Sequence, residues 1–122
     1  MAGVTVELNE LNQLVATLEH KTNGMDSRTS LVVRKAAFDV ERIAKTLAPV
    51  DTGFLKNSIH TQIRTANFRT YGAEVIAGAN YASYLEYGTS RMAPQPYMQP
   101  ALDRVSPGFL AAMAAIANPL GS

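Results

Sequence analysis

The sequence predicts an α+β fold, in which a long amphipathic helix packs on a small antiparallel β-sheet and further helices flank it at the N- and C-terminal ends. Two changes of pattern indicate this class. Apolar residues recur at three- and four-residue steps over 27–47, as on one face of a helix, and at every second residue within 59–79, as on one face of a sheet. The 122 residues, 47% hydrophobic and 17% charged, are typical of one globular domain.

The first two helices are expected over residues 8–21 and 27–47. The earlier one is indicated by apolar residues at helical spacing, namely Leu8, Leu11, Val15 and Leu18. Asn23-Gly24 then supplies a helix stop. The apolar stripe of the later helix consists of Val33, Ala36, Ala37, Val40, Ile43, Ala44 and Leu47. Pro49 ends that helix, because the residue before a proline is disfavoured in the α region.

A loop over 48–53 leads to two strands, over 59–64 and 73–79, with a turn at 67–72 between them. We expect these strands to pair as an antiparallel hairpin under the long helix. In the first strand, Ile59, Thr61 and Ile63 are predicted to face the core, and His60 to face outward.

A short tyrosine-rich helix over 81–87 ends at Gly88, and an extended loop follows to residue 100. A C-terminal helix begins near Met98. Ser106-Pro107 is predicted to break it and to start a last, alanine-rich helix. We therefore divide the single domain into an N-terminal helical region (1–24), a central part (25–105) and a C-terminal helix (106–122).

Composition excludes several kinds of chemistry. The absence of cysteine removes disulfides, thiolate metal sites and cysteine nucleophiles. His20 and His60 belong to different predicted elements and cannot readily supply a zinc site, so no metal or other cofactor is expected. The formal net charge of +1 is small for a general nucleic-acid coat. No segment reaches the ~18–20 apolar residues that span a bilayer, so no membrane partner is expected. We expect the protein to be made and used in the cytoplasm.

Asp51-Thr52-Gly53 is the most enzyme-like string, because aspartic proteases place a carboxylate on a tight D-T/S-G loop and pair two of them. Here the triplet follows a helix and a proline instead of a hydrophobic strand, and bulky and charged residues continue it. The alternative is a capped turn, in which Asp51 or Thr52 accepts hydrogen bonds from the next helical turn. We therefore expect no enzymatic activity.

Two other features leave alternatives open. Residues 25–70 carry eight Lys and Arg against four Asp and Glu, which describes either a solvated helix face or a surface that tolerates phosphates without reading sequence. Tyrosine and methionine gather around the proline-rich loop over 81–98, which suits either an interface or a core. Glu86 within it is expected to be a solvated or hydrogen-bonded structural carboxylate.

The order of three motifs resembles the small neck or tail-completion proteins of long-tailed bacteriophages and related prophages. The resemblance covers residues 28–105. The motifs are Ala48-Pro49-Val50-Asp51-Thr52-Gly53 with Leu55-Lys56 and Ser58-Ile59, then Tyr81-Ala82 with Tyr84-Leu85-Glu86-Tyr87-Gly88-Thr89, and last Met92-Ala93-Pro94-Gln95-Pro96-Tyr97-Met98 with Pro100-Ala101-Leu102.

The resemblance implies a structural virion protein at the head–tail junction, assembled in the bacterial cytoplasm, that helps to complete the tail and join it to the DNA-filled head. It implies a homo-oligomeric ring, with six-fold symmetry the first expectation, around the DNA channel. Its expected partners are the head-closure, tail-terminator and tail-tube proteins, and DNA is contacted without sequence preference. A tail terminator is the main alternative; a head-closure protein leans more towards β-barrel structure.

A ring contact between unlike surfaces needs two complementary patches. The resemblance makes two segments candidates for these patches or for the scaffold that holds them: Asp51, Thr52, Gly53 and Leu55, and then Tyr84, Glu86, Gly88, Thr89, Pro94, Pro96 and Tyr97. It makes the basic residues of the long helix candidates for lining the channel: Arg28, Arg34, Lys35, Arg42 and Lys45.

Overall fold

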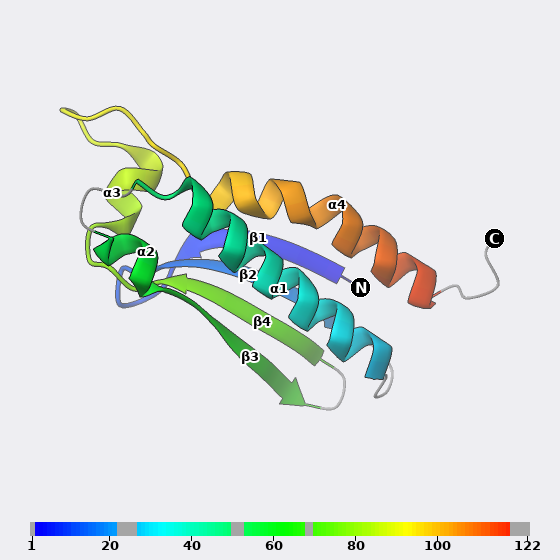
Figure 1. Cartoon of the computed structure of the whole chain (residues 1–122). Helices are drawn as coiled ribbons and strands as arrows, with labels where there is room; N and C mark the ends of the chain where they lie inside the picture. The colour runs from blue at the N-terminus through cyan, green and yellow to red at the C-terminus, as the bar shows by residue number, and fades with distance from the viewer. Residues whose placement is uncertain (1, 22–26, 50–52, 68–69, 118–122) are drawn as a thin grey trace.

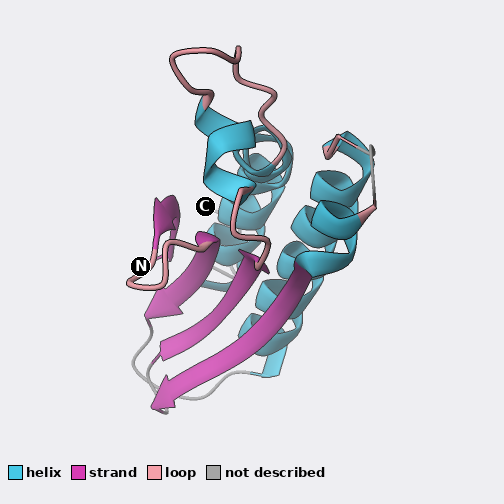
Figure 2. Ribbon diagram, turned by 90° about the vertical axis from the view of Figure 1, so that its left-hand side faces the viewer, coloured by secondary structure: helices cyan, strands magenta, loops and turns pink. Residues whose placement is uncertain are grey.

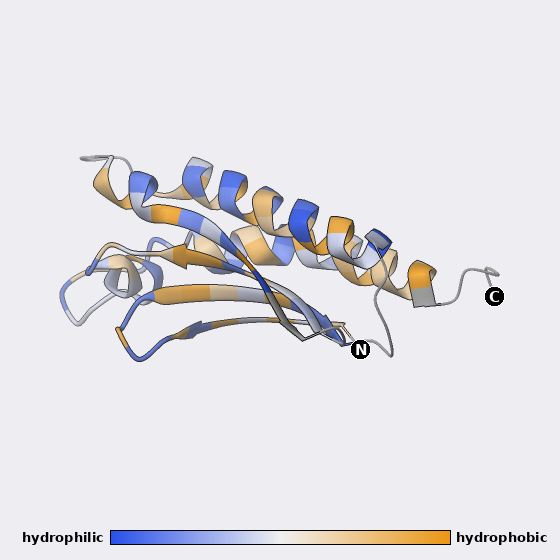
Figure 3. Ribbon diagram, turned by 90° about the horizontal axis from the view of Figure 1, so that it is seen from below, coloured by the Kyte–Doolittle hydropathy of each residue, from blue (hydrophilic) through white to orange (hydrophobic). Residues whose placement is uncertain are grey.

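A computed structural model describes residues 2–21, 27–49, 53–67 and 70–117, and it confirms the α+β class. In these ranges the chain forms one four-stranded antiparallel sheet and two long helices that cover the same face of it (Figures 1 and 3). In chain order the elements are β1 (Ala2–Leu8), β2 (Leu14–Lys21), α1 (Ser27–Leu47), α2 (Phe54–Ser58), β3 (Ile59–Asn67), β4 (Thr70–Ala77), α3 (Ala82–Tyr87) and α4 (Met98–Ala117).

The sheet consists of two hairpins joined along their inner strands, in the order β1-β2-β4-β3. The central pairing of β2 with β4 runs from Leu14 opposite Ala77 to Lys21 opposite Thr70. Helix α1 lies over β3 and β4, and α4 lies beside it over β1 and β2. The fully buried side chains between these layers are mainly large and apolar: Leu14, Leu18, Val33, Val40, Ile59, Val75, Tyr97, Met98, Leu102 and Met113.

The predicted helix over 8–21 is wrong, because this segment is the turn and second strand of a hairpin. Its apolar residues also fit a period of two, and Leu14, Ala16 and Leu18 are fully buried against the helices. β2 pairs with β1 on one side and β4 on the other, and these pairings supply hydrogen-bond partners for its backbone N–H and C=O groups. In a helix, the same groups would be paired within the segment. Leu8 and Leu11, by contrast, are exposed.

The helix predicted over 27–47 is confirmed with those bounds. Its stripe is buried as expected, except that Ile43 and Leu47 are only partly buried. The short tyrosine-rich helix predicted over 81–87 is also confirmed, as α3, whereas α2 was not predicted. The two strands predicted over 59–64 and 73–79 are β3 and β4; β3 continues to Asn67, and β4 begins earlier, at Thr70, and ends earlier, at Ala77. His60 is exposed as predicted.

Ile63 lies on the helix-facing side of the sheet as predicted, in register with Ala73 and Leu18, but its side chain is 40% exposed. It lies on β3, which is an edge strand and pairs only with β4. An edge strand has a neighbouring strand on one side only, so less of its helix-facing side is covered.

The predicted break at Ser106-Pro107 is also wrong, because α4 continues through both residues. Pro107 has no N–H to donate to the carbonyl of Asp103, and a proline inside a helix costs about 3 kcal/mol. The helix persists because Leu102, Phe109 and Met113 are buried on both sides of this point. Pro107 itself faces solvent, so its ring meets no core side chain.

The other face of the sheet has no helix over it in the described parts of the chain (Figure 3). By register, Thr5, Thr17, Glu74 and Gln62 form one row across its strands. Glu74 there pairs with Arg64 at 3.3 Å between carboxylate and guanidinium. The next row on this face, Glu7, Val15, Ile76 and His60, adds two apolar residues that are buried, Val15 and Ile76. This face is therefore mixed, with polar residues along most of it, in contrast to the apolar, helix-covered one.

Candidate assembly interface

The predicted motifs come together at one end of the molecule, where α2, α3 and the loop over 88–97 meet beyond the strands (Figures 1 and 2). Leu55 comes from α2, and Tyr84 and Glu86 come from α3. Gly53 precedes α2 in the left-handed region, at φ 72°. Asp51 and Thr52 lie outside the described residues, so the capped turn predicted for them stays a prediction. We call this end of the molecule the corner.

Glu86 is a structural clamp between α3 and α4. Its side chain is buried, with the residue 3% exposed. One carboxylate oxygen, Oε1, accepts hydrogen bonds from the backbone N–H groups of Tyr97 and Met98 at 3.0 and 2.8 Å, and Oε2 accepts one from Gln99 at 2.9 Å. The first N–H groups of a helix have no partner within it, and the helix dipole favours a negative charge there. Glu86 therefore holds the start of α4 against α3.

Tyr97 makes the second link between these elements. Its ring is fully buried, and its hydroxyl donates a hydrogen bond to the carbonyl of Ala82 at 2.9 Å. Burial raises the pKa of Tyr97 far above its usual value, and the nearby Glu86 carboxylate adds to this. The phenol thus stays protonated and keeps donating. Glu86 and Tyr97 belong to the scaffold of the corner and do not form its outer surface.

Gly88 fixes the path of the loop. Its φ is 76°, and a Cβ there would lie 2.8 Å from the carbonyl oxygen of Met92 and 2.8 Å from the nitrogen of Pro94. The loop closes on itself through hydrogen bonds between Thr89 and Met92, and Gln95 donates to the carbonyl of Leu85 at 2.7 Å. Only a residue without a Cβ fits this approach of backbone to backbone. The loop over 88–97 is therefore held in place at both ends, while Pro94 and Pro96 are exposed on it.

The outer surface of the corner is apolar and aromatic. A pocket of about 440 Å³ is lined by Pro49, Phe54, Leu55, Tyr81, Leu85, Met92 and Gln95. Phe54 packs its ring 6.2 Å from that of Tyr81, yet Phe54, Tyr84 and Tyr87 are each more than half exposed. Partial burial, followed by the charge of Glu86, raises the pKa of Tyr87. An apolar pocket lined by Phe54 and Tyr81, with the exposed Tyr84 and Tyr87 on the same short helix α3, is typical of protein contact sites.

The five basic residues predicted to line a channel all lie on α1. Lys35 and Arg42 both approach Asp39, at 2.7 and 3.7 Å, and Lys45 approaches Glu41 at 3.3 Å. These pairs join residues three or four positions apart on the helix surface. Arg28 and Arg34 are exposed on the same helix. The pairing reduces the positive charge that α1 presents to an approaching phosphate.

The sequence interpretation missed two surface features. Phe54 was not identified because α2 was not predicted, although an aromatic residue after Gly53 was visible. Leu8 and Leu11 were assigned to the core side of a helix, whereas the structure exposes them at the β1–β2 turn. The signal for that turn was Asn9 and Asn12, two residues that favour turns, within the segment read as helical.

Other kinds of site find no support in the described ranges. No three His, Asp or Glu side chains come close enough there to hold a metal ion. No helix in these ranges is long and apolar enough to cross a membrane. The candidate catalytic residue Asp51 lies outside them.

Exposed aromatic side chains on a rigid support are typical of surfaces for assembly with other proteins. The chain matches the model of the HK97-gp10-like family over residues 13–88, which is more than half of its 122 residues. That family is described as "Bacteriophage HK97-gp10, putative tail-component". The chain therefore belongs to the HK97-gp10-like family of phage tail components, as the motif order predicted, and its role is that of a structural virion protein. Neither a curated protein nor a solved structure matches it significantly.

Proposed function

We propose that this protein forms a ring at the neck of a long-tailed phage, where it completes the tail and joins it to the DNA-filled head. The observation that carries the proposal is the corner: an exposed aromatic surface held rigid by the Glu86 clamp in a chain that belongs to a tail-component family. Preorganised contact surfaces bind with less loss of conformational entropy. A neck protein needs such surfaces for its own copies and for the head-closure, terminator and tail-tube proteins.

In a ring of unlike contacts, each copy presents one patch to the copy before it and another to the copy after it. The corner serves as one of these patches, with Phe54, Tyr84 and Tyr87 as its contact residues and Gly88 and Glu86 as its support. A six-fold ring is the arrangement we test first. The basic residues of α1 that lie away from α4 (Arg28, Arg34 and Lys45) line the channel. They contact passing DNA weakly and without sequence preference.

Complementation tests the corner directly. A phage with a stop codon at Glu7 is supplied with the protein from a plasmid, as wild type, Phe54→Asp, Tyr84→Asp or the control Gln62→Asp. Gln62 is exposed on the uncovered face of the sheet. We expect both corner variants to fold, shown by unchanged circular dichroism, and to lower the yield of infectious particles at least about tenfold, while the control supports growth. Full growth with both corner variants would refute this patch.

A tail terminator is the second candidate, because a terminator is also a tail component. It differs from a neck protein in what its loss leaves behind. Without a terminator, tail tubes grow to uncontrolled lengths, whereas without a neck protein, tails of normal length fail to join heads.

A further inference from the structure

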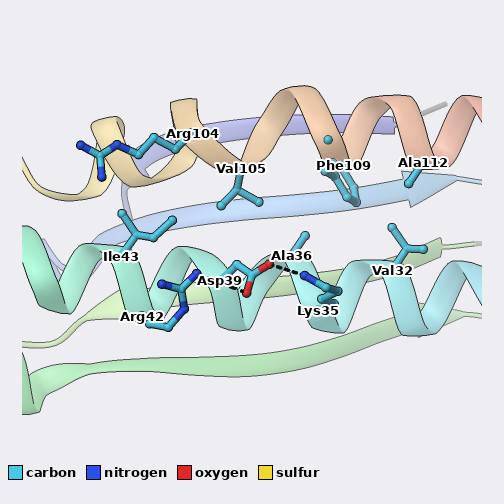
Figure 4. Close-up of a pocket in the computed structure, with 11 residues that line it drawn as sticks. Val32, Lys35, Ala36, Asp39, Arg42, Ile43, Arg104, Val105, Phe109 and Ala112 are labelled. Carbon is cyan, nitrogen blue, oxygen red and sulfur yellow. Dashed lines mark hydrogen bonds and ion pairs between the residues drawn. The ribbon is translucent and has the colours of Figure 1, made fainter.

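A groove runs between the two long helices, on the side away from the sheet (Figure 4). Its volume is about 480 Å³. The floor is apolar and comes equally from both helices: Val32, Ala36 and Ile43 from α1, and Val105, Phe109 and Ala112 from α4. An apolar groove of this size on a small domain marks a candidate site for an apolar group from a partner.

The groove is deepened by a glycine in an unfavourable place. Gly108 lines it and directly follows Pro107 inside α4. Both residues are poor helix formers, at about 1 and 3 kcal/mol relative to alanine. A Cβ on Gly108 would meet no atom within 4 Å, so packing inside the chain does not require a glycine here. Local rules are broken most often at functional sites, which suggests that the space above Gly108 is used.

The rim of the groove is cationic. Lys35 and Arg42 of α1 and Arg104 of α4 surround the floor, with Asp39 as the one carboxylate among the lining residues. Asp39 lies between Lys35 and Arg42 and pairs with both. The rim therefore keeps an excess of positive charge, and the best partner for this groove is an apolar side chain flanked by carboxylates.

The turn between β1 and β2 has that chemistry. Leu11, at its tip, is 73% exposed, and Leu8 is exposed beside it. Glu7 and Glu10 flank them and are exposed as well. The turn is rigid, because the Asn9 side-chain oxygen accepts hydrogen bonds from the N–H groups of Leu11 and Gln13, each at 2.9 Å. It is a preorganised apolar and acidic tip.

The tip cannot reach the groove of its own chain. It lies at the end of the sheet where α2 and α3 sit, whereas the groove lies along the outer side of the helices (Figures 1 and 4). We propose that the β1–β2 tip of one copy docks in the α1–α4 groove of the next copy, with Leu11 against the floor near Gly108. This inference rests on the proposed ring and specifies one of its contacts, in which Glu7 and Glu10 face Arg42 and Arg104.

Disulfide cross-linking in phage particles tests this contact, and the chain contains no cysteine of its own. The variant Leu11→Cys/Gly108→Cys is supplied to the Glu7 stop-codon phage, and particles are oxidised and run on a non-reducing gel. We expect a ladder of dimers, trimers and larger multiples. The matched control Gln62→Cys/Gly108→Cys, with its first cysteine on the uncovered sheet face, should stay monomeric. A monomer band alone, or equal ladders in both, would overturn the proposal.

The same particles separate the two levels of the hypothesis. If the protein is in the particles but gives no ladder, docking of the tip is wrong and the neck function stands. If the protein is missing from particles that form normally, the neck function itself fails.

Charge exchange gives an independent result. Glu7→Lys/Glu10→Lys and Arg42→Glu/Arg104→Glu should each lower particle yield by at least about tenfold through like-charge contacts, and combining all four should recover most of it. No recovery, with all variants folded, would contradict the pairing.

Discussion

Replacement of Glu86 by alanine should strongly destabilise the fold. The Glu86 carboxylate accepts hydrogen bonds from the backbone N–H groups of Tyr97, Met98 and Gln99 at the start of α4, and alanine removes all three. A net hydrogen bond to a charged group contributes about 1.5–3 kcal/mol, and part of this returns when water reaches the freed N–H groups. We therefore expect a loss of about 3–5 kcal/mol. For 122 residues, 1 kcal/mol corresponds to about 4 °C in Tm, so the Tm should fall by about 10–20 °C.

Urea and thermal unfolding followed by circular dichroism measure this loss. Glu86→Gln keeps one acceptor oxygen but places a side-chain NH₂ group beside a backbone N–H donor. The free energy of unfolding should therefore fall by about 2 kcal/mol. Asp103→Asn is the matched control, because it removes a carboxylate from an exposed position on α4, the helix that Glu86 holds, and should change stability by less than about 0.5 kcal/mol. An effect of Glu86→Ala no larger than that of the control would refute the clamp.

Three further predictions concern single positions. Gly88→Ala should cost at least about 3 kcal/mol in urea unfolding because its Cβ meets backbone at 2.8 Å, whereas Gly53→Ala, with positive φ but open space, should cost only about 1 kcal/mol; equal costs would contradict the steric argument. Tyr97→Phe removes the hydrogen bond to the Ala82 carbonyl and should lower the free energy of unfolding by about 1 kcal/mol; an unchanged value would show that the hydroxyl contributes nothing to stability. Burial lowers the pKa of His20 below 6.5, so the unfolded chain binds more protons below that pH, and stability should fall as pH drops through 6.5. His20→Leu should flatten this dependence; an unchanged slope would exclude His20 as its source.

The parts of the fold that followed from sequence are those with one strong local period. Helix α1 was predicted with its observed bounds because a charged face and an apolar stripe both repeat along it. The alternation at Ile59–Ile63 identified β3, but not how far it is covered, since that depends on which helix packs over it. Residues 8–21 fit helical and strand periods alike, and pairing with β4, far along the chain, decided between them.

The two motif segments meet in the structure, but what their residues do there did not follow from the sequence. Motif order indicated the segments around Leu55 and Glu86, and these do meet at the corner. Sequence could not separate support from surface, because Glu86 and Tyr97 face inward only through contacts with α4, which tertiary packing creates. The predicted helix break at Pro107 was wrong for the same reason. The cost of a proline in a helix can be read from the local sequence, but the burial of neighbouring α4 residues that offsets it depends on tertiary packing.

Electron microscopy of a lysate from the phage with a stop codon at Glu7 tests the neck function most directly. A ring that joins tails to heads predicts separate DNA-filled heads and tails of normal length, and rejoining when the protein is added back. Tails of uncontrolled length would identify a terminator instead, and intact infectious particles would contradict a role in joining.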